Sequence, residues 1–262
     1  MSETSRLFTD GEAYEQVMGR WSRMVGERFL DWLDVPTGMR WVDIGCGNGA
    51  FTELIVARCA PSSIFGFDPS SGQIAFARTR PGAQQADYQV AGAEALPLAD
   101  DSADAAVMAL VISFVTNPAK AIAEMARVTR PGGWVATYMW DLERDGVPTF
   151  HIHAAAKSLG ISTGSLPNTV VARQEVMRDL WQTAGLVSVE TMVIRIPVRH
   201  ESFEDYWAIQ SLPVGPAGRL IQTMSPDQTE QLRTRLREIM PIAADGSIAF
   251  EAVANAIKGR VP

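Results

Sequence analysis

Apolar residues near the N-terminus recur every three or four positions, which is the period of an amphipathic helix. They lie at Tyr14, Met18, Trp21, Val25, Phe29 and Trp32 and predict a helix over residues 11–33. The stretch "DVPTG" (34–38) ends this helix, because proline and glycine both interrupt helical structure.

Beyond residue 38 short continuous apolar runs alternate with runs of helical period. Predicted strands cover 40–44, 63–68, 86–92, 104–111 and 132–140, and predicted helices cover 50–60, 70–79 and 118–129. Strands that alternate with helices form βαβ units, in which right-handed crossovers join parallel strands. This half of the chain therefore predicts an α/β fold with a parallel sheet.

After Trp140 the regular alternation stops. Residues 141–168 predict an irregular segment, because they hold three glycines and two prolines. The pattern resumes with a helix over 173–184, a strand over 186–195, a mainly helical stretch over 200–245 and a last strand over 247–259. The simplest organisation is one domain with an inserted cap after the fifth strand.

The stretch "WVDIGCGNGAFT" (41–52) joins the first predicted strand to the helix after it. Its glycines permit positive φ angles and let a ligand approach the backbone, and the helix presents unpaired N–H groups at its start. Such turns bind cofactors at the carboxyl ends of parallel strands. A loose dinucleotide pattern, G-x-G-x-x-A, also fits Gly45 to Ala50 and is weak evidence by itself.

Asp43 separates the two cofactor classes that use this turn. The phosphates of a dinucleotide gain nothing from a nearby carboxylate, whereas a ligand with an amino group and a sulfonium does. Asp43 followed by Gly45, Cys46, Gly47 and Asn48 resembles the first motif of the class I S-adenosylmethionine (SAM)-dependent methyltransferases. The resemblance is to their type 11, UbiE-like group.

Three further stretches follow at the spacing of that family. Asp68 in "FGFDPSSGQ" is similar to the acidic residue that accepts both ribose hydroxyls, and "AGAEALPLADDSAD" (91–104) is similar to the adenine-side loop. "ARVTRPGGWV" (126–135) is similar to the turn before the fifth strand. The resemblance implies a Rossmann-like, seven-stranded, mainly parallel sheet with helices on both faces and a helical cap insertion.

The resemblance also implies a cofactor, SAM, with S-adenosylhomocysteine (SAH) as product. It divides the domain 1–262 into an N-terminal helical lid (1–38), a SAM-binding core (39–140), a cap and substrate region with strand six (141–245) and a final strand (246–262). The implied cofactor-binding residues are Tyr14, Met18, Arg20, Trp21, Asp43, Gly45, Cys46, Gly47, Asp68, Pro69, Gln73, Ala93, Glu94, Leu110 and Val111.

Two positions depart from the family pattern. Gly92 stands where many relatives have an aspartate that bonds the adenine amino group, so the backbone of Ala93 or the side chain of Glu94 must take that role. Ser113 stands where a histidine is frequent in quinone-type and sterol-type relatives. No catalytic residue is therefore carried over from the family.

The segment "YEQVMGRWSR" (14–23) resembles an opening helix that covers the methionine end of SAM. In that role Tyr14 and Arg20 would bind the SAM carboxylate, and Met18 or Trp21 would close over the sulfonium. The alternative is an amphipathic helix with Met18 and Trp21 in the core and Arg20 in solvent.

Aromatic residues of the second half either line an acceptor pocket or form core. They are Trp140, Phe150, Trp181, Phe203, Tyr206 and Trp207. Tyr138 and Trp140 alternate along the fifth strand, so both rings face one side of the sheet, where they border the acceptor pocket or pack under a helix. Residues 200–225 would close the far wall.

Three histidines, His151, His153 and His200, are candidates for a general base, with solvated surface histidine as the default. His151 and His153 share a face only if their segment is extended. No metal-ligand spacing is present, and Cys46 and Cys59 predict free thiols.

The net charge of −7 argues against sequence-independent binding of nucleic acid. The polar start "MSETSRLFTDGE" and the short apolar runs predict a cytoplasmic protein without a membrane segment. The expected partner is a small-molecule methyl acceptor, and the expected state is a monomer or homodimer.

The leading hypothesis is therefore a SAM-dependent methyltransferase that acts on a small, apolar or aromatic metabolite at oxygen, carbon or nitrogen by in-line displacement. The place of the [N/D]-P-P-[Y/F] box of adenine-N6 and glutamine-directed relatives holds "ALVI" (109–112), which counts against nucleobase amino-methylation. The alternatives are a catalytically silent SAM-binding regulatory protein and a nicotinamide-dependent oxidoreductase.

Overall fold

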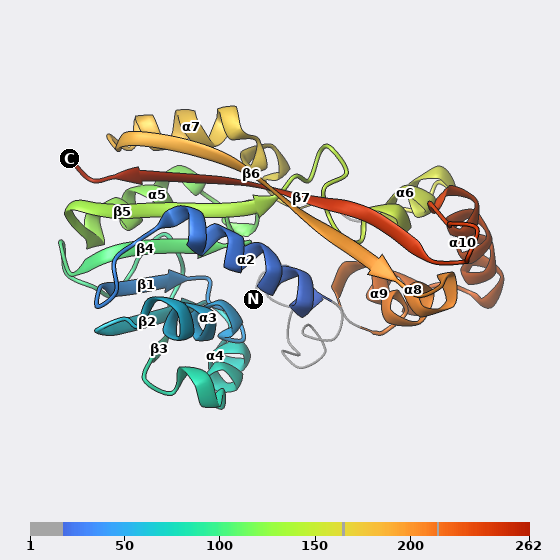
Figure 1. Cartoon of the computed structure of the whole chain (residues 1–262), viewed down its shortest axis with the longest axis horizontal. Coiled ribbons are helices and arrows are strands. Elements are labelled where there is room, and N and C mark those ends of the chain that lie inside the picture. The colour runs from blue at the N-terminus through green and yellow to red at the C-terminus, as the bar shows by residue number, and fades with distance from the viewer. Residues whose placement is uncertain (1–17, 164–165, 214) are drawn as a thin grey trace.

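The computed structural model describes residues 18–163, 166–213 and 215–262. One seven-stranded sheet runs through the molecule in the order β3-β2-β1-β4-β5-β7-β6, with helices on both of its faces (Figure 1). The strands are β1 (Arg40–Ile44), β2 (Ser63–Asp68), β3 (Asp87–Val90), β4 (Ala103–Ala109), β5 (Thr129–Trp140), β6 (Val187–His200) and β7 (Ile248–Arg260). β1 to β5 pair in parallel, whereas β7 pairs antiparallel with both β5 and β6. The predicted fold class is confirmed.

The helices follow the predicted order. They are α2 (Arg20–Leu33), α3 (Ala50–Cys59), α4 (Ser71–Ala77), α5 (Pro118–Val128), α6 (Phe150–Ser158), α7 (Gln174–Thr183), α8 (Phe203–Gln210), α9 (Gly215–Gln222) and α10 (Pro226–Ile239). Three short 3-10 turns, η3 (Pro81–Ala83), η4 (Ile112–Phe114) and η5 (Thr169–Ala172), complete the described elements. The predicted helix over 11–33 is confirmed over 20–33, and residues 11–17 lie outside the described part of the chain.

The two faces of the sheet bury separate cores. One contains α2, α3 and alternate strand residues such as Val107, and the other contains α5, α7 and the intervening residues such as Met108. Tyr138 and Trp140 belong to the first core and Met139 to the second. This confirms that the two rings face one side of the sheet, as the period of two requires.

The amino ends of three strands are joined through one carboxylate. Asp104, at the start of β4, accepts hydrogen bonds from the guanidinium of Arg40 on β1 (3.0 Å) and from that of Arg130 on β5 (2.6 Å). These bonds hold the pKa of Asp104 well below its usual range. Arg130 belongs to the "TRPGG" stretch, so this family motif supports the sheet at its amino end.

The segment after β5 corrects one expectation. Residues 141–168 were predicted to be irregular, but they contain α6, which packs with α8, α9 and α10 in a third apolar core, the cap. The periodicity of "FHIHAAAKS" is weak because its core-facing residues, Ile152, Ala155 and Ala156, are mostly small. Figure 1 shows the cap at the far ends of the long strands β6 and β7.

Strand β6 is longer than predicted, since it continues to His200 through Pro197. Proline removes a backbone donor and is tolerated at a sheet edge, where β6 lies. The extension carries the β6–β7 pairing as far as His200 and Ile248, beside the cap.

Five of the six aromatic candidates belong to the apolar cores, namely Trp140 in the first core and four others. Phe203, Tyr206 and Trp207 pack in the cap. Trp181 is fully buried between α7 and the sheet, where its indole N–H donates to the Val135 carbonyl oxygen at 3.1 Å. For these four residues the core interpretation holds.

Trp181→Ala should lower the free energy of unfolding by about 3–5 kcal/mol, because it opens a cavity and removes a buried hydrogen bond. Urea unfolding followed by far-UV circular dichroism measures this loss. Phe150→Ala is the matched control, because Phe150 belongs to none of the three cores named above and should cost clearly less. Equal losses in the two variants would contradict the assignment of Trp181 to the core.

Candidate cofactor and acceptor site

The glycine turn joins β1 to α3 through three residues of positive φ, which are Gly45 (+73°), Gly47 (+52°) and Gly49 (+81°). A Cβ on Gly45 would lie 2.5 Å from a methyl of Val111, so a side chain there would clash. A Cβ on Gly47 would meet nothing within 4 Å. Gly47 therefore leaves open space above the backbone, as a ligand-binding turn requires.

Asp68, the last residue of β2, holds the turn in place. Its Oδ2 accepts a hydrogen bond from the Gly47 N–H at 3.0 Å, and its Oδ1 accepts one from the Ser70 N–H at 2.8 Å. Burial raises the pKa of Asp68, while the two N–H groups act in the opposite direction. A carboxylate oxygen has two lone pairs, so Asp68 keeps acceptor capacity for ligand hydroxyls.

Asp43 lies beneath the turn. Its side chain is fully buried, its Oδ2 accepts a 2.6 Å bond from the Thr52 hydroxyl, and its Oδ1 has no hydrogen-bond partner in the described part of the chain. Burial raises the pKa of Asp43 to about 7. Asp43 is therefore buried and does not border the cavity in front of the turn.

One cavity of about 1670 Å³ opens in front of the turn and continues to the cap. Twelve of the predicted cofactor residues line it: Met18, Arg20, Gly45, Cys46, Gly47, Asp68, Pro69, Gln73, Ala93, Glu94, Leu110 and Val111. Asp43 and Trp21 are absent from its wall, and Tyr14 lies outside the described residues. We call the part of the cavity bounded by these twelve residues the cofactor half.

Trp21 belongs to the core instead of the wall, with 1% of its surface exposed. The guanidinium of Arg20 lies over its ring at 4.5 Å from the centroid and donates to the Arg199 carbonyl oxygen at 3.1 Å. His200 packs edge-on to Trp21, and its Nδ1 lies 3.0 Å from Asp205 Oδ2. His200 was expected to be a solvent-exposed histidine. This expectation is wrong, because His200 is buried beside the first residues of α2.

Leu110, one of the predicted cofactor-binding residues, has a backbone conformation that the sequence did not indicate. It follows β4 with a φ of +62°, a left-handed conformation that costs a residue with a side chain about 1–2 kcal/mol. Its N–H donates to the Tyr138 carbonyl oxygen at 2.9 Å, which keeps the two strand ends together beside the cavity. Strained backbone of this kind clusters at functional sites.

The adenine-side loop has a second role in the structure. The Glu94 side chain accepts a 2.8 Å hydrogen bond from the Asn117 N–H at the start of α5. Ala93 and Gly92 line the cavity beside it.

The remaining wall, which we call the acceptor half, comes from residues after β4. Among the residues that bound it are Phe114, Trp140, Leu142, Phe150, His153, Ala154, Lys157, Ser158, Leu166, Gln210 and Ala217. Of the aromatic candidates, Trp140 and Phe150 reach it. His153 does so as well, whereas His151, two residues earlier on α6, packs against Phe250. The wall residues of α6, at positions 150, 153, 154 and 157, lie at helical spacing.

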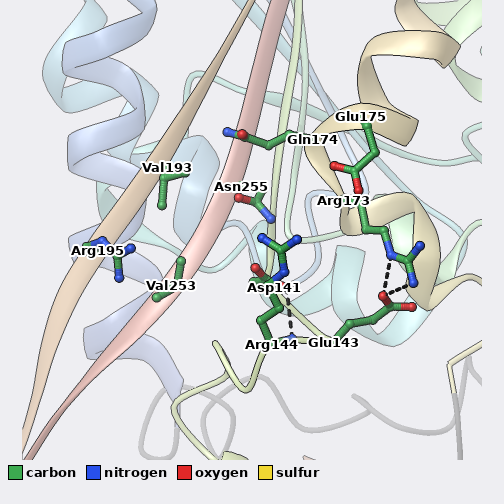
Figure 2. Close-up of a pocket in the computed structure, with 10 residues that line it drawn as sticks. All are labelled: Asp141, Glu143, Arg144, Arg173, Gln174, Glu175, Val193, Arg195, Val253 and Asn255. Carbon is green, nitrogen blue, oxygen red and sulfur yellow. Dashed lines mark hydrogen bonds and ion pairs between the residues drawn. The ribbon is translucent and has the colours of Figure 1, made fainter.

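A second, smaller pocket of about 200 Å³ lies between the end of β5, the start of α7 and strands β6 and β7. Figure 2 shows its charged lining, in which Glu143 and Arg173 pair with each other. Asp141 accepts from the Arg144 N–H at 3.2 Å, and Asn255 donates to the Ala172 carbonyl oxygen at 3.0 Å. These contacts hold the segment after β5 against its neighbouring elements.

The fold is Rossmann-like and has a glycine turn at the carboxyl end of its first strand, and comparison with known proteins finds similarity to methyltransferases. Residues 42–137 match the family model described as "Methyltransferase domain". The family resemblance of the sequence motifs is confirmed.

The chain is 38% identical over 117 residues to malonyl-[acyl-carrier protein] O-methyltransferase of Methylococcus capsulatus, a match that covers 44% of this chain and 42% of that protein. It is 34% identical over 114 residues to demethylmenaquinone methyltransferase of Renibacterium salmoninarum, which covers 44% and 45%. The matches thus span less than half the length of these relatives.

A solved structure, phosphoethanolamine N-methyltransferase 2 of Haemonchus contortus in complex with SAM, superimposes with a TM-score of 0.60 at 16% identity. The superposition covers all of this chain and 60% of that one, and it shows the shared fold.

No described helix is both long enough and apolar enough to span a membrane, and the described residues hold no cluster of metal-ligating side chains.

Asp43→Asn should change the pH dependence of stability. The pKa of Asp43 is raised from 3.8 to about 7 in the folded state, so the folded protein keeps a proton that the unfolded chain loses, and stability falls as the pH rises from about 4 to 7. Asp43→Asn does not titrate in this range, so it lacks this loss in the free energy of unfolding. The loss amounts to about 4 kcal/mol between about pH 4 and 7. Urea unfolding of both proteins between pH 4 and 8 measures it, with Asp87→Asn, at an exposed position of β3, as control. Parallel curves for wild type and Asp43→Asn would contradict the raised pKa.

Proposed function

We propose that this protein transfers a methyl group from SAM to a small, apolar or aromatic acceptor by in-line displacement. The observation that carries the proposal is the single cavity that joins the glycine turn to the cap. Its volume of about 1670 Å³ exceeds the roughly 300–1000 Å³ of a pocket for one small molecule. Cofactor and acceptor therefore fit side by side in one enclosure.

The cofactor half supplies the groups that SAM needs. Asp68 would accept the ribose hydroxyls, the backbone at Ala93 would bind the adenine, and Met18 and Arg20 would cover the methionine end. The N–H groups at the start of α3 and the turn at Gly47 would receive the polar part of the ligand.

Methyl transfer from a sulfonium requires mainly that the acceptor atom, the methyl carbon and the sulfur lie in line and away from water. A base is needed only where the acceptor must lose a proton. The largely apolar acceptor half would supply the alignment and the exclusion of water. The relatives named above methylate different acceptors by their names, so none of their substrates is transferred to this chain.

Asp68→Ala should weaken SAH binding by about 1.5–3 kcal/mol, or roughly 10- to 150-fold in Kd, because charge-assisted bonds to two hydroxyls are lost. Isothermal titration calorimetry measures the change. Asp87→Ala removes a carboxylate from the adjacent strand at a position outside the cavity wall and should leave the affinity unchanged. Circular dichroism checks that both variants are folded, and an unchanged affinity in folded Asp68→Ala would remove the ribose assignment.

Methyl transfer itself is tested with methyl-labelled SAM and an extract of small metabolites, using the loss in Asp68→Ala as the specificity control. Labelled product that depends on Asp68 supports the proposal. Tight SAH binding without any labelled product would instead favour a SAM-binding protein without turnover.

A further inference from the structure

Arg20, the first residue of α2, is a wall residue of the cofactor half whose side chain is held by a distant part of the chain. Its Nη2 donates to the Arg199 carbonyl oxygen at 3.1 Å and lies 3.4 Å from Nε2 of His200. The guanidinium also lies over the Trp21 ring, 4.5 Å from its centroid. An arginine side chain has many rotamers in solution, so three such contacts select one position for its charge.

The charge of Arg20 has no carboxylate partner among the described residues. Two other arginines of the cavity wall are paired, Arg23 with Glu27 and Arg80 with Glu53. The groups that contact Arg20 are a carbonyl oxygen, an imidazole and an indole ring, none of which is an anion. Arg20 therefore keeps its charge for an anionic group of a ligand at this wall.

His200 is oriented from its other side by Asp205 of α8. Its Nδ1 lies 3.0 Å from Asp205 Oδ2, and its ring packs edge-on to Tyr206 at 5.0 Å between centroids. An ionised carboxylate only accepts and a guanidinium only donates, so the neutral ring carries its proton on Nδ1 and accepts through Nε2. Burial lowers the pKa of His200, which favours this neutral form. Arg20 thus donates to His200, and His200 donates to Asp205.

A ligand in the cavity can contact Arg20 but not the two residues behind it. Arg20 is exposed, whereas the His200 side chain is fully buried, and neither His200 nor Asp205 belongs to the described cavity wall. His200 can therefore affect a ligand only through Arg20. Because 180 positions separate these two residues, their contact also ties the first turn of α2 to the cap end of β6.

We propose that Asp205 and His200 are positioning residues, which hold the Arg20 guanidinium where it binds the carboxylate at the methionine end of the cofactor. Arg199 and His200 engage Nη2, which leaves the N–H groups of Nε and Nη1 for the ligand. A fixed guanidinium binds a carboxylate more tightly than a mobile one, because less side-chain freedom is lost on binding. This inference rests on the proposed function, since it concerns the cofactor of that site.

Two nucleosides test the proposal by isothermal titration calorimetry. SAH carries the amino-carboxylate end, whereas 5′-methylthioadenosine has the same adenosine and sulfur without it. Arg20→Met should weaken SAH about tenfold or more, because charge-assisted bonds to the carboxylate are lost. His200→Leu should weaken SAH about five- to tenfold, because the guanidinium loses the bond that holds it. Neither variant should change the affinity for 5′-methylthioadenosine.

Arg28→Met is the matched control for both variants. Arg28 also donates from α2 to a carbonyl oxygen of β6, that of Arg195, but it lies outside the cavity wall. Its loss should leave both affinities unchanged. Circular dichroism checks that each variant is folded.

Three further readouts separate positioning from a merely structural role. His200→Gln keeps an acceptor for Arg20 and should bind SAH within about twofold of the wild type. In the Arg20→Met background, His200→Leu should cause no further loss, because the two residues act as a unit. Long-range 1H–15N spectra of the ligand-free protein should show the His200 proton on Nδ1, with the signal assigned by its absence in His200→Gln.

A proton on Nε2 of His200, additive losses in the double variant, or equal weakening of both nucleosides would overturn the proposal. Arg20→Met and the tautomer of His200 give this decision even without a folded His200→Leu. Unchanged SAH affinity in folded His200→Leu would overturn the proposal and leave the proposed function intact, whereas a wild type that does not bind SAH would overturn both.

Discussion

The hydrogen bond between Asp68 and the Gly47 N–H is the contact on which the cofactor half depends. It connects the turn after β1 to the end of β2, and it is reinforced by the Phe67 carbonyl oxygen, which accepts from the N–H groups of Gly45 (2.6 Å) and Cys46 (2.9 Å). The shape of the turn is therefore set by the neighbouring strand as well as by its own glycines. Because the two strands are parallel, their carboxyl ends meet at one edge, and the cavity opens there.

The acceptor half depends on a different constraint, which is the length of β6 and β7. Their antiparallel pairing extends past the parallel strands and carries the cap at its far end (Figure 1). The chain returns from the cap along β7, whose other edge pairs with β5 up to Trp140. The wall at Trp140 and the wall at Gln210 are thereby held on one framework, although 70 positions separate them in the sequence.

The difference between these two constraints explains what the sequence could predict. The glycine turn, Asp68 and the strand–helix alternation are local patterns, and the structure places them as expected. Asp43 was recognised as unusual, but its depth beneath the turn depends on packing from Thr52 and the neighbouring strands. The glycine signature therefore identifies the site better than it identifies which polar groups touch a ligand.

The aromatic residues of the second half show the opposite case. Phe150 and Phe203 are equally apolar and begin helices of similar length, yet one lines the cavity and the other packs in the cap. Their burial is decided by how α6 and α8 meet across the β6–β7 extension, which no periodicity in either helix encodes. Gln210 was not predicted for the same reason, since it belongs to a helix that also contributes to the cap core.

The division between the halves also bears on substrate choice in this fold. The family match ends at residue 137, whereas most of the acceptor half comes from residues after that point. Similarity over the matched core therefore concerns the cofactor half and carries almost no information on the acceptor. A fold that separates the two in this way can change its acceptor by altering α6, α8 and the loops between them while the turn and Asp68 stay fixed. The cap and the loops after β5 are thus the part of the cavity wall on which the family match carries no information.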